Sequence, residues 1–224
     1  MTFKCAYCGK PVGPKEKEHV IASCLYPKSK ARSKVQRITV PTCRDCNASW
    51  ADDEAHFRNV INVSGDANEP ARELWQTTTR SFNKSDGRRR LIDLIQRLQP
   101  VKVDGRERFM IYPGKDERVI RIIRKIVRGL CHFHQVATAV DERRVWADVL
   151  KYKIPDEFLK DMPILHREPD ILQYRFAVLN QVGIDSVWVL TFFERTIFIS
   201  IVSESIGDLN KFMNDPVKAP HKST

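Results

Sequence analysis

The sequence contains no long hydrophobic run. None of its apolar stretches reaches the roughly 18 residues that a membrane-spanning helix requires. The N-terminus, from Met1 to Cys5, also lacks the apolar segment of a secretory signal. We therefore expect a protein without a membrane segment that works in the cytoplasm.

Acidic residues are fewer than basic ones. The 224 residues include 28 Asp and Glu against 38 Lys and Arg, which gives a formal net charge of +10. The excess lies in residues 1–128, with 27 basic and 15 acidic side chains, whereas residues 129–224 hold 11 and 13. The content of 42% hydrophobic residues excludes wholesale disorder. The asymmetry predicts a face in the first half that binds a polyanion.

The expected secondary structure mixes helices with antiparallel strands. Periodicity and composition predict helices over 48–63, 70–82, 88–98 and 116–134, and strands over 18–21, 38–40, 106–112, 171–180, 187–193 and 196–202. The last three strands are separated by short turns, which indicates an antiparallel meander. We predict an α+β fold with three parts: a metal-stapled module at 1–64, a mixed helix and antiparallel-sheet domain of unknown role at 65–205, and a polar C-terminal tail at 206–224.

Cysteines are few, six in all, and four of them form two C-x-x-C pairs. The pairs are Cys5 with Cys8 and Cys43 with Cys46, and four thiolates complete a tetrahedral zinc shell. The 34 residues between the pairs exceed the spacing of simple zinc ribbons, so a structural insertion is expected. We predict one structural zinc ion per chain, because a closed shell of four thiolates leaves no open position for catalysis.

The insertion and the residue after the second pair carry a resemblance. Glu18 and His19 lie between the pairs, and Asn47 follows Cys46 directly. The order C-x-x-C, acidic residue and His, C-x-x-C-N resembles the HNH, or ββα-metal, endonucleases, over about a quarter of the chain. The resemblance implies a β-hairpin and a helix around one divalent ion, with a separate four-cysteine zinc that pins hairpin to helix. It also implies a nucleic-acid substrate, and we expect double-stranded DNA.

The resemblance assigns roles to these residues. His19 is the expected general base, because imidazole exchanges protons near neutral pH. Glu18 and Asn47 would bind catalytic Mg²⁺ or Mn²⁺ through oxygen. His56 is a further candidate ligand, in competition with the acidic residues at 52–54. Adjacent strand residues point to opposite faces, so Glu18 and His19 share a site only if the strand bends or ends there.

Two departures from the family pattern keep an alternative open. The family more often has Asp or His at the position of Glu18, and its middle Asn is missing here, with Gln36 nearest in position. A catalytically inactive zinc module that binds nucleic acid therefore remains the alternative. The basic faces could also serve RNA or a protein partner, and a homodimer would convert nicking into double-strand cleavage.

Two groups of basic residues could form a track for phosphates. The loop between His19 and Cys43 has no acidic residue among its five cations, which are Lys28, Lys30, Arg32, Lys34 and Arg37. The track could continue along Arg88–Arg90 and a helical stripe of Arg118, Arg121, Lys125 and Arg128. Solvated loops and helix faces explain these charges equally well.

Overall fold

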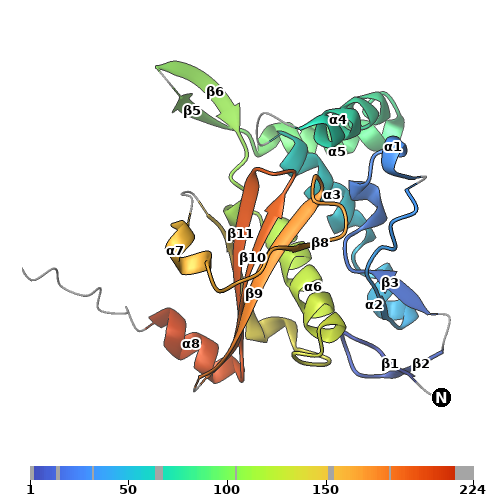
Figure 1. Cartoon of the computed structure of the whole chain (residues 1–224). Coiled ribbons are helices and arrows are strands. Elements are labelled where there is room, and N and C mark those ends of the chain that lie inside the picture. The colour runs from blue at the N-terminus through green and yellow to red at the C-terminus, as the bar shows by residue number, and fades with distance from the viewer. Residues whose placement is uncertain are drawn as a thin grey trace, which may run out of the picture.

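The computed structural model confirms the α+β class. It describes residues 3–13, 16–31, 33–63, 68–103, 105–150, 154–181 and 183–214 (Figure 1). Within these residues, no helix combines the length and the hydrophobicity needed to traverse a bilayer.

A five-stranded antiparallel sheet forms the centre of the molecule. Its strands, in spatial order, are β7 (Val145–Val149), β11 (Thr196–Ser203), β10 (Ile184–Phe192), β9 (Leu172–Gln181) and β8 (Leu165–His166). Strands β9, β10 and β11 pair consecutively, which confirms the predicted meander. Short edge strands β7 and β8, which the sequence did not reveal, extend it on both sides.

Helix α6 (Glu117–Phe133) packs on one face of this sheet (Figure 1). It confirms the helix predicted over 116–134, and buried Asp116 caps it by accepting the Arg118 N–H at 3.1 Å. Apolar residues at 3- and 4-residue spacing are fully buried along it, including Ile123, Ile126 and Leu130. The helix contacts β7 and β11 on one side and the N-terminal segment on the other.

The N-terminal segment consists of two small pairs of antiparallel strands interspersed with helices. In chain order these elements are β1 (Phe3–Lys4), β2 (Pro11–Val12), β3 (Lys17–His19), a 3₁₀ turn (Ser23–Leu25), α1 (Lys28–Ala31), β4 (Thr39–Pro41), α2 (Arg44–Ala48) and α3 (Ala51–Val63). Strand β1 pairs with β2, and β3 pairs with β4. The helix predicted over 48–63 is divided, because the chain turns at Ser49 and buries Trp50 against Tyr7, with 4.5 Å between ring centroids.

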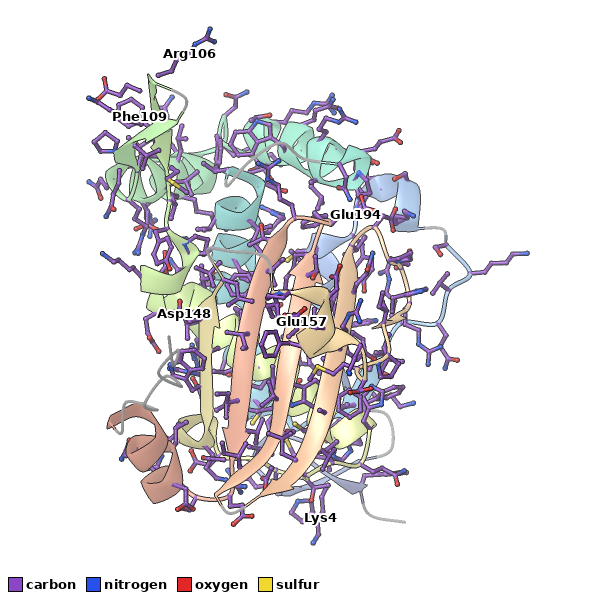
Figure 2. All side chains as sticks on the ribbon, turned by 60° about the vertical axis from the view of Figure 1, so that its left-hand side comes forward. Lys4, Arg106, Phe109, Asp148, Glu157 and Glu194 are labelled. Atoms are coloured by element: carbon purple, nitrogen blue, oxygen red, sulfur yellow. The ribbon has the colours of Figure 1, made fainter. Side chains whose placement is uncertain are left out.

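The remaining elements lie around the sheet, α6 and the N-terminal segment. They are α4 (Glu69–Ser81), α5 (Ser85–Gln96), β5 (Gln99–Val103), β6 (Arg106–Met110), two 3₁₀ turns (Pro113–Lys115 and Glu142–Arg144), α7 (Asp156–Leu159) and α8 (Ile206–Asn214). The β5–β6 hairpin projects from the body, as Arg106 and Phe109 show (Figure 2). Helix α8 begins the predicted tail, and residues 215–224 lie outside the described residues.

One hydrophobic core joins the N-terminal segment to the sheet. Phe57 of α3 is fully buried and contacts two sheet residues, with its ring centroid 5.2 Å from that of Phe192 and 6.3 Å from that of Phe198. The buried residues from Cys5 to Val202 form a single cluster. The core is therefore continuous across the domain boundary predicted at residues 64–65.

Candidate metal centre and its charged surroundings

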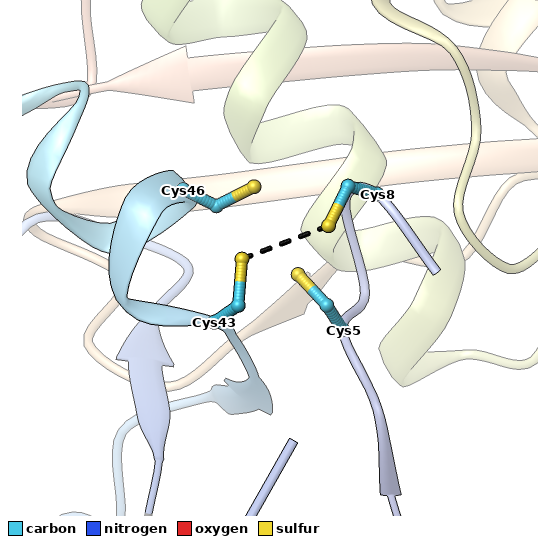
Figure 3. A group of neighbouring side chains, drawn as sticks. All are labelled: Cys5, Cys8, Cys43 and Cys46. Carbon is cyan, nitrogen blue, oxygen red and sulfur yellow. Dashed lines mark hydrogen bonds between the residues drawn. The ribbon is translucent and has the colours of Figure 1, made fainter. Parts of the chain in front are cut away.

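The four paired cysteines meet in space. All four Sγ atoms lie within 4.8 Å of one another, and those of Cys8 and Cys43 are 3.6 Å apart (Figure 3). A tetrahedral zinc ion with Zn–S bonds of about 2.3 Å places its sulfurs about 3.8 Å apart, so the geometry fits zinc. Cys5 and Cys8 lie on the turn after β1, where Gly9 adopts a φ of 74°. Cys43 precedes α2 and Cys46 lies within it, so the site staples the first hairpin to this helix.

The thiols of this cluster influence each other's ionisation. Burial alone would raise the pKa of Cys5, but backbone hydrogen bonds, the strongest from Cys43, outweigh it and lower the pKa to about 7. Burial raises the pKa of Cys46, and its hydrogen bond with Cys43 raises it further. Four thiolates at this separation repel one another, and a bound dication removes that repulsion.

The other two cysteines lie outside the cluster. Cys131 on α6 is fully buried, and Cys24 is partly buried. Burial raises the pKa of Cys131 to about 12 and that of Cys24 to about 11. Both are therefore unreactive thiols at neutral pH.

Glu18 and His19 lie at the end of strand β3. Glu18 pairs with Val40 in regular antiparallel register, and the pairing continues past β3, where the Val20 N–H donates to the Ile38 carbonyl at 3.0 Å. Strand β3 ends at His19, and the chain bends at Val20 and Ile21. Glu18 is partly buried and Val20 is fully buried, whereas His19 is exposed. The strand therefore ends at this pair, which is the condition under which Glu18 and His19 could share one site, and the shared site stays a prediction.

A buried ammonium group holds the Glu18 carboxylate. Lys125 of α6 is 1% exposed, and its Nζ donates to Glu18 Oε1 at 2.6 Å, to Glu54 Oε1 at 2.5 Å and to the His19 carbonyl at 3.0 Å. The Trp50 ring lies below, with its centroid 5.4 Å from Nζ. Glu18 therefore has a lysine as its partner in this structure, and its role as a metal ligand stays a prediction.

Asn47 and His19 are both accessible. Asn47 lies in α2 with an exposed side chain, and its backbone N–H donates to the Cys43 carbonyl at 3.0 Å. The His19 imidazole is exposed and has no hydrogen-bond partner among the described residues. In the described part of the chain, the four cysteines are the one group of three or more His, Cys, Asp or Glu side chains arranged to hold a metal.

His56, the further ligand candidate, has carboxylates on both sides. It is 5% exposed, with Nε2 2.7 Å from Asp116 Oδ2 and Nδ1 3.5 Å from Asp93 Oδ2. Burial raises the pKa of Asp116, but the hydrogen bond and charge of His56, with the charge of Arg97, outweigh burial and lower it. His56 thus connects α3 to α5 and α6, and neither ring nitrogen is directed at Glu18.

The basic stripe of α6 makes many of its contacts within the protein. Arg118 and Arg121 both pair with Asp53 of α3, at 2.8 and 2.6 Å. Arg128 is buried and donates to the Tyr7 carbonyl at 2.7 Å. With Lys125 already described, the whole stripe lies against the N-terminal segment. The acidic start of α3 lies opposite α6 and competes with a phosphate for these arginines, and the track along α6 stays a prediction.

Two cations of the predicted phosphate-binding loop form ion pairs within the protein. Lys30 Nζ lies 2.7 Å from Asp170, and Arg37 lies 3.7 Å from buried Glu168. The Arg37 guanidinium also covers the Tyr26 ring, 3.6 Å from its centroid. These contacts attach the loop to the connection between β8 and β9.

Two of the other three loop cations have no ion pair among the described residues. Lys28 and Lys34 are exposed and form no ion pair with any described residue. Arg32 lies outside the described residues. The part of the loop that is available to a phosphate is therefore smaller than the sequence suggested.

Comparisons with known proteins found no match to this chain. No family model matches the chain, and neither a curated protein nor a solved structure matches it. The family resemblance therefore rests on the motif residues alone.

We expect the purified protein to contain about one zinc ion per chain. Cys46→Ser removes one thiolate ligand and should abolish stable zinc binding, measured by elemental analysis after purification without chelator. Cys24→Ser, which changes a thiol outside the cluster, is the matched control and should retain the metal. A wild-type protein that lacks zinc would contradict the four-cysteine site.

Removing the Lys125 ammonium should destabilise the fold strongly. Lys125→Met leaves two neighbouring carboxylates without their shared cation, so the free energy of unfolding should fall by about 3–5 kcal/mol in urea denaturation. Adding Glu18→Gln and Glu54→Gln to this variant should recover much of the loss, because no carboxylate then lacks its partner. Lys84→Met, at an exposed position, is the control and should change the free energy of unfolding little. If Lys125→Met has an effect as small as this control, the ion-pair role is disproved.

Proposed function

We propose that the protein is a zinc-stabilised endonuclease of the ββα-metal type that hydrolyses phosphodiester bonds in DNA. One arrangement supports this most. The β3–β4 hairpin leads directly into the cysteine cluster and the helices behind it, and the side chains of His19 and Asn47 are both exposed on this segment. The motif residues with the most direct chemical roles are therefore those that solvent and substrate can reach.

In this proposal His19 is the general base. Its imidazole is exposed and lacks a hydrogen-bond partner among the described residues, so a water molecule can approach it. His19 removes a proton from that water as the oxygen attacks the phosphorus, and the bond to the 3′ oxygen breaks. The products are a 5′-phosphate and a 3′-hydroxyl end.

The donor set for a divalent ion is only partly suitable. The Asn47 side chain is exposed, whereas the Oε1 atom of Glu18 accepts a hydrogen bond from Lys125. A bound Mg²⁺ or Mn²⁺ would neutralise charge on the phosphate and the leaving oxygen. Asn47 would be its protein ligand, and we now assign Glu18 to positioning the hairpin through Lys125.

A nicking assay tests this proposal. Wild-type protein with Mg²⁺ or Mn²⁺ should relax supercoiled plasmid, and His19→Ala should lower the rate about 100-fold or more, because it removes the base. His166→Ala, at another exposed histidine, should cleave like the wild type. Glu18→Gln should retain more activity than Asn47→Ala if Glu18 positions the hairpin. Equal cleavage by the wild type and His19→Ala would refute the catalytic assignment.

The second candidate is a zinc module that binds nucleic acid without cleaving it. The ion pair between Lys125 and Glu18 favours this candidate, because an ammonium group already occupies the expected metal ligand. Failure to cleave duplex, single-stranded, branched and RNA substrates, together with binding that weakens steeply as salt is raised, would establish it.

A further inference from the structure

A second polar site lies where α3, α5 and the first turn of α6 meet. These helices enclose a pocket of about 400 Å³, a volume in the range of small-ligand sites. Buried His56 and Asn59 of α3 line it. Arg89 and Arg90 of α5 and Arg118 of α6 complete much of its lining. None of these residues takes part in the proposed cleavage.

The Asp93 carboxylate in this site is already paired with basic side chains of the protein. The Asp93 carboxylate lies 3.2 Å from Arg97, 3.4 Å from Arg118 and 3.5 Å from the His56 ring. Asp52, which also lines the pocket, is exposed. The pocket therefore does not present a cluster of unpaired carboxylates, and it is poorly suited to a metal ion.

Two arginines in the lining have no counter-ion among the described side chains. Neither the Arg89 nor the Arg90 guanidinium group forms an ion pair or a hydrogen bond with any described side chain or carbonyl. Burial lowers the pKa of the neighbouring Arg58, and the charge of Arg90 lowers it further. Arg58 donates to the Asn59 side-chain oxygen at 3.1 Å, which leaves the Asn59 amide group as a donor. The site thus combines uncompensated positive charge with a buried donor.

We propose that this pocket binds a phosphate group, with the guanidinium groups of Arg89 and Arg90 as its principal ligands. Guanidinium forms paired, charge-assisted hydrogen bonds with phosphate oxygens, and the Asn59 amide supplies a further donor. His56, held by Asp116 and Asp93, fixes the shape of the pocket from below. The phosphate belongs either to a small molecule such as a nucleotide or to the end or backbone of a nucleic acid.

Binding measured without a divalent ion tests the proposal. Calorimetry with inorganic phosphate and adenosine 5′-monophosphate should show saturable binding to the wild type. Arg89→Gln combined with Arg90→Gln should weaken it about tenfold or more, because two charge-assisted contacts are lost. The control pair, Lys84→Gln with Arg88→Gln, removes the same charge near the start of α5 from residues that do not line the pocket, and should bind like the wild type.

Two results would overturn the proposal. One is the absence of saturable binding to the wild type, and the other is equal weakening by both variant pairs, which would indicate general charge attraction. Thermal melting without ligand checks that the variants fold, and the single Arg89→Gln and Arg90→Gln variants repeat the test if the double variant does not.

A comparison of DNA duplexes with and without a 5′-phosphate identifies the source of the ligand. Preference for the phosphorylated duplex indicates a nucleic-acid end, and stronger binding of the mononucleotide indicates a small molecule. Either preference supports the pocket. His19→Ala should leave all these affinities unchanged, so a failure of the proposed nuclease activity is distinguishable from a failure of this site.

Discussion

The N-terminal segment depends on one buried ammonium group. Removing a charged lysine from water is costly unless its hydrogen-bond donors are satisfied, and Lys125 satisfies them with Glu18, Glu54 and a backbone carbonyl. These partners come from the β3–β4 hairpin and from α3, so both elements must stay against α6. The cysteine cluster joins the other end of the segment. The Lys125 ion pair thus fastens the N-terminal segment to helix α6. The cysteine cluster fastens two parts of the segment to each other.

This attachment determines how the motif can work. At the end of β3, Glu18 contacts Lys125 while His19 is exposed, so one residue of the pair serves stability and its neighbour is available for chemistry. The proposed base therefore lies between a carboxylate held by an ion pair and a fully buried valine. Such rigidity suits a catalytic group, because a base must keep its position relative to the phosphorus.

The sequence was informative where the signal is local. Cysteine spacing predicted the cluster, and apolar periodicity predicted α6 and the three-strand meander. It failed where a partner lies far along the chain: Lys125 is 107 residues from Glu18, and nothing in the sequence pairs them. The position of Lys125, one turn from buried Ile122 and Gly129, was the available sign that it would be buried. The break before α3 depends similarly on the tertiary contact of Trp50 with Tyr7.

The same long-range pairing changes the meaning of the net charge. Much of the basic excess in the first 128 residues lies on α6, where its arginines and Lys125 are bound to acidic groups and carbonyls within the protein. Two of the loop cations are paired as well. Arg88, Arg89 and Arg90 of α5 instead remain exposed and without partners among the described residues. A polyanion would therefore encounter these arginines of α5 more readily than the paired cations of α6, because counting charges along a sequence does not subtract those that folding neutralises.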